Sequence, residues 1–373
     1  MSYKILHIIN GEHFAGAERV QDLLALNLPK LGFECEFICL KEGEFNKRRN
    51  STCPSTVFAM NSKFDLGVSK RIINAVKDKN FQIIHTHTAR SALIGKKIAR
   101  ALNIPWVHHV HSPTARDTES IIRNTLNAFI EDYLILPKAD HLIPVSLSLK
   151  DYLLEHGVDE SKITPVFNGV PIVKSAVNWL PPENGKWTIG TVALFRPRKG
   201  LEVLLNAIQK LKENDHKIRL KAVGIFETPE YENEIKGLAQ KLNITDLIEW
   251  TGFSNDVHKE MEPMHIFVLP SLFGEGLPMV VIEAMSVGIP VVSTDVEGIP
   301  DVLDNGKAGI IVKANSVTGL TEGLMTYING ITSPLETTLT AHKRQKDYFS
   351  DIAMTKGVSD IYLNLIRNSR RSK

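Results

Sequence analysis

Short apolar runs of strand length alternate with helix-like segments through the first half of the chain. Strands are predicted at Tyr3–Ile9, Glu34–Leu40, Gln82–His85, Trp106–Val110, His141–Val145 and Thr164–Phe167. Helices are predicted between them at Ala17–Leu31, Ser69–Lys79, Ala89–Ala101 and Thr118–Ile135. This alternation is typical of α/β proteins in which helices cover a parallel, doubly wound sheet.

The same alternation begins again at Trp187, after a polar segment, residues 174–186, that is predicted to be a linker. Strands are predicted at Trp187–Ala193, Arg219–Val223, Ile248–Thr251, Ile266–Leu269, Val291–Ser293 and Gly309–Val312. The tail from Ser333 to Arg367 is predicted to be helical. The pattern therefore predicts two Rossmann-like domains, residues 1–175 and 186–350, and a terminal helix within residues 351–373.

The composition narrows the class of protein. A chain of 373 residues is too long for one ordinary hydrophobic core, which agrees with two domains. Its 43% hydrophobic and 23% charged residues are typical of soluble globular proteins. A formal net charge of only +2 argues against a dedicated nucleic-acid binder.

The cysteines and the apolar runs indicate the compartment. The chain has three cysteines, Cys35, Cys39 and Cys53. Their number is odd and their spacing is not that of a zinc ribbon, so neither a disulfide framework nor a zinc ribbon is indicated. The N-terminus has no signal-peptide pattern, and no uncharged apolar run reaches the length of a membrane span. These observations predict a cytoplasmic protein.

Candidate chemistry is concentrated in the segment Ser271–Met285. It follows the apolar run Ile266–Leu269, and Pro278 suits the first turn of a helix because its missing N–H is not needed there. Glu283 falls among apolar residues, so its carboxylate is predicted to be buried, which is costly without a partner. Either Glu283 lies on a solvated face, or hydroxyl groups of a bound molecule satisfy it. The apolar neighbours favour the second interpretation.

Glu275 and Glu283 are separated by seven residues at this predicted strand-to-helix turn. The spacing resembles the E-x7-E signature of the retaining GT-B glycosyltransferases of family 4 (glycosyl transferases group 1). The sequence that follows, Gly288–Asp295 and Gly298–Val302, also resembles this family. The resemblance covers nearly the whole chain. It implies a GT-B fold of two Rossmann-like domains facing a central cleft, with the last helix crossing back to the first domain.

The resemblance also implies roles for the residues of this turn. Glu283 would hold the ribose hydroxyls of a sugar nucleotide, and Glu275 would orient the transferred sugar. Gly276, Leu277 and Pro278 stand at the start of the predicted helix. The N–H groups and the dipole of a helix N-terminus can stabilise a pyrophosphate.

A second candidate site is the run Ala193–Gly200, between a predicted strand and a predicted helix. Breaking the bond to a nucleotide diphosphate places negative charge on the leaving group, which nearby cations stabilise. Lys199 matches the lysine of the family's Gly-Arg-Leu-x-x-x-Lys-Gly run, whereas Leu194 stands where the arginine is expected. Arg196, with Arg198 as a second candidate, is predicted to replace that arginine. The alternative is that these are solvated loop charges.

The first predicted turn contains Gly11 and Gly16, which have the spacing that opens a P-loop. Ala17–Glu18 occupies the place of the phosphate-binding Lys-Ser/Thr, and no G-x-G-x-x-G follows the strand, so neither signature is complete. A glycine loop before a helix still allows close approach to a phosphate or sugar. The family has a comparable Gly-Gly-Ala-Glu loop, with Ala15 here in place of its first glycine. Gly16 is therefore a candidate contact, and a plain turn is the alternative.

Histidines cluster at two predicted strand ends, as His85 and His87 and as His108, His109 and His111. Such pairs could bind zinc in a hydrolase. The two groups follow different strands, and no set of Asp or Glu completes such a site, so no metal is predicted. In the family that the chain resembles, the histidine matching His111 lies near the transferred sugar. His85 and His87 are expected to be structural or acceptor-side residues.

The remaining implications concern the substrates. Gly252 and Phe253 resemble the family's loop over the nucleotide base. The chain contains no Asp-x-Asp, the carboxylate pair with which a divalent metal bridges a pyrophosphate, so a metal-independent reaction without a cofactor is expected. The resemblance implies a hexosyltransferase that moves a sugar from a UDP- or GDP-linked donor to an acceptor hydroxyl with retention. Glu275, His111, Lys199 and Arg196 would be its catalytic residues.

The acceptor is expected to be a saccharide or a lipid-linked saccharide in bacterial polysaccharide, lipopolysaccharide or glycolipid biosynthesis. Basic residues are frequent in the first domain, so contact with an anionic membrane at its inner face is an alternative to a plainly solvated basic surface. No nucleic-acid partner is expected. Two other functions stay open: a sugar-nucleotide epimerase of the same fold, and a catalytically silent GT-B module that binds a partner.

Overall fold

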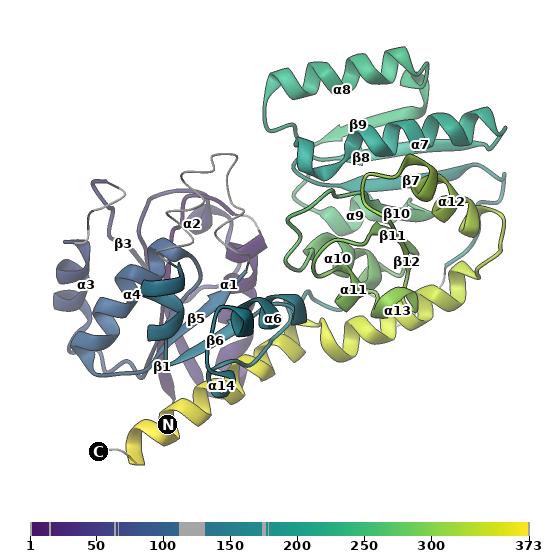
Figure 1. Cartoon of the computed structure of the whole chain (residues 1–373). Helices are drawn as coiled ribbons and strands as arrows, with labels where there is room; N and C mark the ends of the chain where they lie inside the picture. Colours follow the sequence, from purple (N-terminus) through teal and green to yellow (C-terminus); the bar gives the residue numbers. More distant parts are fainter. Residues whose placement is uncertain are drawn as a thin grey trace. The chain divides into compact units, whose positions relative to one another are not determined.

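The computed structural model describes residues 2–14, 16–62, 65, 67–111, 131–173, 177 and 179–371. The chain forms two compact units (Figure 1). The first unit comprises Met1–Gly169 and Asp351–Lys373, and the second comprises Val170–Ser350. The first unit is therefore built from two stretches of sequence that are far apart in the chain.

The first unit contains a parallel sheet in the order β3-β2-β1-β4-β5-β6. Its strands are β1 (Tyr3–Ile9), β2 (Phe33–Cys39), β3 (Ser55–Val57), β4 (Ile83–Thr86), β5 (Trp106–Val110) and β6 (His141–Pro144). Its α-helices include α1 (Gly16–Asn27), α2 (Glu44–Arg48), α3 (Val68–Val76), α4 (Ala89–Leu102), α6 (Leu147–Glu155) and α14 (Asp351–Arg371). Short helical turns lie at Leu28–Leu31, Glu131–Ile135, Leu136–Lys138 and Glu160–Lys162. The strand order reverses between β1 and β4, as in a doubly wound fold.

The second unit repeats this arrangement with the sheet order β12-β11-β10-β7-β8-β9, again all parallel. Its strands are β7 (Trp187–Val192), β8 (Ile218–Val223), β9 (Ile248–Gly252), β10 (Ile266–Leu269), β11 (Val291–Thr294) and β12 (Ile310–Val312). Its α-helices include α7 (Leu201–Glu213), α8 (Pro229–Lys241), α9 (Val257–Met261), α10 (Met279–Val287), α11 (Ile299–Val302), α12 (Val317–Ile328) and α13 (Pro334–Tyr348). Short 3-10 turns lie at Pro197–Lys199, Thr245–Leu247 and Asp304–Gly306. The order reverses between β7 and β10.

The predicted fold class, α/β with two Rossmann-like parallel sheets, is confirmed. Two predicted elements and one strand that was not predicted need comment. Thr164–Phe167 is not a strand, because Pro165 has no N–H and only isolated residues bond to the edge strand β6, such as Val166 N to Pro144 O at 3.0 Å. The edge strand Ser55–Val57 was not predicted; it is three residues long and carries little apolar pattern. Of the helix predicted at Thr118–Ile135, residues 118–130 lie outside the described residues.

Local sequence sets the bounds of α4. Thr88 and Ser91 form a capping box, in which each side chain bonds the other residue's backbone N–H. The helix ends at Asn103, which adopts a left-handed conformation (φ 52°) that asparagine tolerates well. The helix therefore begins at Ala89, two residues after His87, which directly follows the last residue of β4.

The last helix, α14, is part of the core of the first unit. Asn27 Nδ2 donates to Asp351 Oδ2 at 2.8 Å where α14 begins. Further along, the fully buried Tyr362 packs edge-on against Phe33, with ring centroids 5.5 Å apart, and its hydroxyl bonds His85 Nδ1 on β4. Side chains from the two ends of the sequence thus share one core.

Removing this hydroxyl tests the contribution of α14. We expect Tyr362→Phe to lower the free energy of unfolding by about 1–2 kcal/mol, because the buried His85 nitrogen loses its partner while the packing volume is kept. Urea unfolding followed by circular dichroism measures the change. Tyr348→Phe is the control, since Tyr348 is 54% exposed and its loss should be close to neutral. Equal effects of the two substitutions would contradict the assignment.

Candidate active site

Two loops meet at the reversal point of the second sheet. One loop follows β7 and spans residues 193–200, and the other follows β10 and spans residues 270–278. Leu272 N donates to Arg198 O at 2.8 Å, so the loops are joined by their backbones. Ligands of doubly wound sheets bind outside the carboxyl ends of the strands at this reversal point. These loops carry most of the candidate residues that the sequence predicted.

Gly200 allows the close approach of the two loops. Its φ is +64°, and a Cβ at this position would lie 2.1 Å from Pro270 O. Both features exclude an ordinary side chain. A left-handed backbone is strained for residues other than glycine, and the carbonyl of Pro270 cannot easily move away. The glycine after Lys199 therefore serves the geometry of the loops.

We expect Gly200→Ala to destabilise the protein by about 1–3 kcal/mol, because the substitution strains the backbone and forces the two loops apart. Thermal unfolding measures the change in stability. Gly237→Ala is the matched control, because Gly237 lies inside α8 with no atom within 4 Å of an added Cβ. That control should be neutral or stabilising by up to about 1 kcal/mol. A Gly200→Ala protein as stable as this control would contradict the interpretation.

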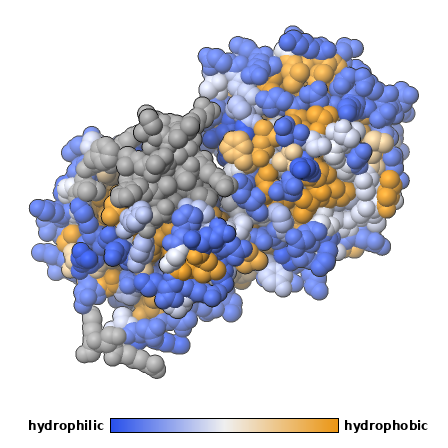
Figure 2. Space-filling model, in the orientation of Figure 1, coloured by the Kyte–Doolittle hydropathy of each residue, from blue (hydrophilic) through white to orange (hydrophobic). Residues whose placement is uncertain are grey.

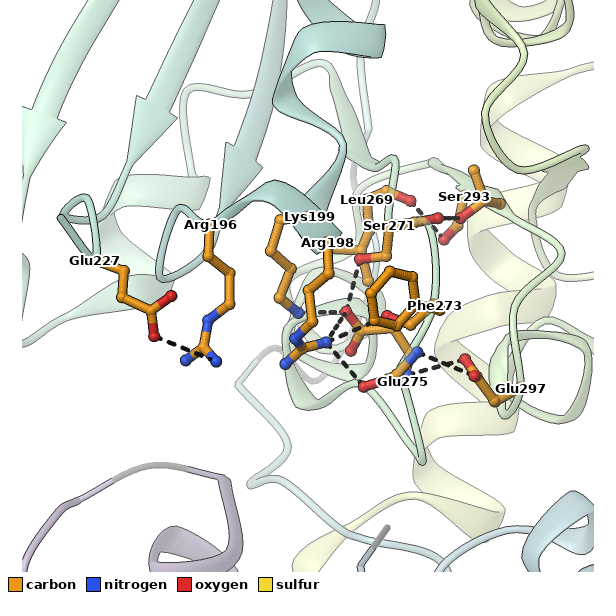
Figure 3. A network of polar contacts seen from close by, with 12 residues as sticks. Arg196, Arg198, Lys199, Glu227, Leu269, Ser271, Phe273, Glu275, Ser293 and Glu297 are labelled. Carbon is orange, nitrogen blue, oxygen red and sulfur yellow. Dashed lines mark hydrogen bonds and ion pairs between the residues drawn. The ribbon is translucent and has the colours of Figure 1, made fainter. Parts of the chain in front are cut away.

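Glu275 lies at the centre of a polar network (Figure 3). Its side chain is buried, and its Oε1 accepts a hydrogen bond from Ser271 Oγ at 2.6 Å. The ammonium of Lys199 forms an ion pair with the same oxygen, and Arg198 Nη1 lies 3.7 Å from it. Two cations and a hydroxyl therefore fix the Glu275 carboxylate and offset its charge.

Lys199 is held in a largely desolvated position. Its side chain is 14% exposed. Burial lowers the pKa of Lys199, and the nearby Glu275 carboxylate acts in the opposite direction. The contact with Glu275 thus stabilises the ammonium of Lys199 in a place where little water can solvate it. An anionic group that reaches this place would meet a positive charge weakly screened by solvent.

Glu297 was not singled out by the sequence, yet it organises the same loop. Its two carboxylate oxygens accept hydrogen bonds from Gly274 N and Glu275 N, each at 3.0 Å. In return, Gly298 N donates to Glu275 O at 3.0 Å. Glu297 adopts a positive φ of 30°, uncommon for a side chain of this size. No sequence motif marks this role, because it depends on the contact between two loops that are distant in the chain.

Glu283 is buried as predicted. It is the fifth residue of α10, a helix whose described residues are almost all buried. Its relative exposure is 0%. Pro278 is the N-cap of this helix rather than its first residue. The carboxylate therefore lies within an apolar helix next to the two loops, and the solvated-face interpretation is wrong.

The guanidinium groups of Arg196 and Arg198 have different partners. Arg196 Nη1 pairs with Glu227 Oε1 at 3.4 Å, on the side of the network away from Glu275 (Figure 3). Arg198 instead contacts the loop of Glu275, where its Nη1 donates to Gly274 O at 2.9 Å. Leu194 is 39% exposed. The second candidate, Arg198, is thus the arginine next to Lys199 and Glu275.

The other candidates lie as follows. Gly276 belongs to the 270–278 loop, and its carbonyl would lie 2.2 Å from a Cβ on Gly298, so the loops pack closely here too. Leu277 is buried.

Gly252 ends β9 with a φ of +76°, and Phe253 after it is 53% exposed. An exposed aromatic ring at a strand end is suited to stacking on a base.

The first unit holds Gly16 and the histidines. Gly16 is the first residue of α1, after the β1 loop. His7 on β1 is the register partner of His85 on β4, and β4 is the neighbour of β5. The two histidine groups follow different strands, as the sequence indicated, but these strands are adjacent and the side chains meet.

The imidazoles on one face of this sheet form a chain of contacts. His87 Nε2 lies 3.3 Å from His7 Nδ1, and His87 Nδ1 lies 3.3 Å from His111 Nε2. His109 stacks on His111 with ring centroids 4.6 Å apart. His108 faces the other side of the sheet, where its Nδ1 bonds Thr86 Oγ1 at 2.9 Å.

Burial governs the charge of these rings. It lowers the pKa of His85, His87 and His109 well below the ordinary value, and the neighbouring imidazoles lower it further. Burial lowers the pKa of His111 to about 3. The rings are therefore neutral at physiological pH.

Hydrophilic residues predominate on the visible face of both units, with apolar residues in separate patches (Figure 2). Among the described residues, no helix combines the length and apolar character needed to cross a membrane.

Two family models match the chain, one for each half. Residues 14–174 match the model for Glycosyltransferase Family 4. Residues 178–340 match the model for Glycosyl transferases group 1. The second match contains both loops of the Glu275 network and the helix of Glu283.

Similar proteins have been found by sequence and by structure. The chain is 30% identical over 213 residues to a putative colanic acid biosynthesis glycosyltransferase, WcaL, of Escherichia coli; the match covers 55% of the chain and about half, 52%, of that relative. It is 22% identical over 98% of both chains to an E. coli UDP-Gal:alpha-D-GlcNAc-diphosphoundecaprenol alpha-1,3-galactosyltransferase.

Among solved structures, HepE of Anabaena in complex with UDP and glucose superimposes with a TM-score of 0.82 at 16% identity, over 97% of this chain and 100% of HepE. At this level of sequence identity, the structural likeness supports a shared fold and nothing further. The chain thus has the two parallel sheets of the GT-B fold, and its two halves match two glycosyltransferase family models.

Proposed function

We propose that the protein transfers a sugar from a nucleotide diphosphate sugar, UDP-linked by preference, to an acceptor hydroxyl with retention of configuration. The observation that carries this proposal is the joined pair of loops in the second unit, where Lys199 meets the buried Glu275. HepE, a protein of the same fold, binds UDP, and the E. coli galactosyltransferase relative is named for a UDP-linked donor. The acceptor is a saccharide or lipid-linked saccharide, as the names of the relatives suggest.

The second unit would bind the donor. Glu283 would accept hydrogen bonds from the ribose hydroxyls, and Phe253 would stack on the base. Glu275 would orient the hydroxyls of the transferred sugar from its fixed position. Lys199, with Arg198 or Arg196, would stabilise the leaving diphosphate, and the N-terminus of α10 would add to this stabilisation. This arrangement needs no metal to neutralise the leaving group.

The first unit would bind the acceptor, with Gly16 and His111 near the reacting groups. The acceptor oxygen attacks the anomeric carbon on the face from which the diphosphate leaves, so the new C–O bond forms as the bond between the anomeric carbon and the diphosphate oxygen breaks. The leaving phosphate oxygen takes the proton of the acceptor hydroxyl. This front-face course retains the configuration and requires no separate general base.

Thermal shift with UDP-glucose, UDP-galactose, GDP-mannose and ADP-glucose tests the donor class, since preferential binding to the folded state raises the melting temperature. Product analysis by NMR with a set of lipid-linked and free saccharide acceptors then tests transfer and anomeric configuration. A sugar-nucleotide epimerase would convert the donor without an acceptor. A silent binding module would show neither reaction. An inverted product would contradict the proposed front-face course.

A further inference from the structure

Three histidines of the first unit converge at the carboxyl ends of β4 and β5. His87, His109 and His111 each offer one ring nitrogen, and these three nitrogens lie within 4.8 Å of one another. His87 Nδ1 and His111 Nε2 are 3.3 Å apart. In a tetrahedral zinc site with Zn–N bonds of about 2.0–2.1 Å, neighbouring nitrogens are separated by about 3.3 Å. The nitrogens of His87 and His111 are thus already at the separation expected of two ligands to one zinc ion.

His109 supplies an independent indication of a ligand. Its ring is fully buried, and neither of its nitrogens has a hydrogen-bond partner among the residues that the structure describes. A buried polar atom without a partner costs about 1–3 kcal/mol, so such atoms usually meet a ligand or a water molecule. His111 is only half-buried, which leaves this end of the cluster accessible from solvent.

The surroundings of His87 also suit a ligand to a metal. Its second nitrogen, Nε2, lies 3.3 Å from His7 Nδ1. Metal-binding histidines commonly use the other ring nitrogen in such a hydrogen bond, which fixes the tautomer and the orientation of the ring. His7 would therefore be a positioning residue for His87.

We propose that His87, His109 and His111 bind one divalent transition-metal ion, with Zn²⁺ as the best fit. Three imidazoles favour zinc and its borderline neighbours over Mg²⁺ and Ca²⁺, which require oxygen ligands. Three protein ligands leave a fourth position for water or a substrate group. All three ligands belong to the first unit.

A second group, His7, His85 and His87, shares His87 and also has its nitrogens within 4.8 Å. We favour the first group for two reasons. His7 and His85 are fully buried, so an ion would have no exposed ligand by which to enter. His85 Nδ1 is already engaged by the hydroxyl of Tyr362.

Metal uptake by the full chain tests the proposal. The purified protein, freed of metal by a chelator, is dialysed against Zn²⁺ or Co²⁺, and bound metal is counted by mass spectrometry. We expect one ion per chain and, for Co²⁺, the intense visible absorption of a tetrahedral site. X-ray absorption of the zinc protein should show nitrogen neighbours at about 2.0 Å. These measurements on the unaltered chain do not depend on the folding of a variant.

Variants then locate the site. His109→Gln and His87→Gln should each weaken Zn²⁺ binding by at least about tenfold. His108→Gln is the matched control, because His108 is the buried neighbour of His109 on the same strand but faces the other side of the sheet. It should bind as the unaltered chain does, with circular dichroism confirming that each variant is folded. Failure of the unaltered chain to take up metal, or full binding by folded His109→Gln, would overturn the proposal.

Discussion

Lys199→Ala is expected to lower kcat/KM for glycosyl transfer by about 10²-fold or more. The reason is that the ammonium of Lys199 would stabilise the charge that develops on the leaving diphosphate in a weakly screened position. Steady-state kinetics with a UDP-sugar donor measures the effect. Lys236→Ala is the control, because Lys236 forms an exposed ion pair with Glu232 on α8 in the same unit.

The same substitution should also destabilise the fold, since it leaves the buried Glu275 carboxylate with fewer partners. A double variant separates the two effects. Lys199→Met combined with Glu275→Gln removes both charges and should recover stability without recovering activity. Full turnover by Lys199→Ala, or recovery of turnover in the double variant, would contradict a role for Lys199 at the leaving group.

Glu283→Gln is expected to lower kcat/KM by about 10²-fold while it keeps the volume of the side chain within α10. If the carboxylate accepts hydrogen bonds from the ribose hydroxyls, then a 2′,3′-dideoxyribose donor should be a poor substrate for the unaltered enzyme. The Gln variant should discriminate much less between the two donors, because the interaction is already weakened. Kinetics with both donors and both proteins form a double-mutant cycle.

Glu322→Gln controls for a general effect of removing a carboxylate, because Glu322 is exposed on α12. A Glu283→Gln enzyme that still distinguishes the two donors as strongly as the unaltered enzyme would place the ribose elsewhere. Loss of activity with equal loss of stability would indicate that Glu283 serves the fold alone.

The sequence predicted the structure best where apolar residues form nearly continuous runs. Buried parallel strands are nearly continuous apolar runs, so most strands of both sheets were predicted within a residue or two. The burial of Glu283 followed from its apolar neighbours in the same way. The edge strand Ser55–Val57 is mostly exposed and carries no such run, which is why it was missed.

The arrangement of the site could not be predicted because it depends on contacts between distant loops. Glu297 meets the backbone of Glu275 across more than twenty residues of sequence, and nothing in its neighbours marks that contact. Arg196 and Arg198 are two residues apart, and only the shape of the loop shows which one turns to Glu275. Adjacent strands, not adjacent residues, bring His87 and His109 together.

The placement of α14 has a consequence for biosynthesis. The second unit is formed by one continuous stretch, residues 170–350, whereas the first unit needs residues from both ends of the sequence. The unit whose sequence is translated first must wait for Tyr362 and its neighbours before its sheet is covered on that face. A stop codon shortly after Ser350 would therefore spare the later-translated half and leave the earlier one with an exposed core.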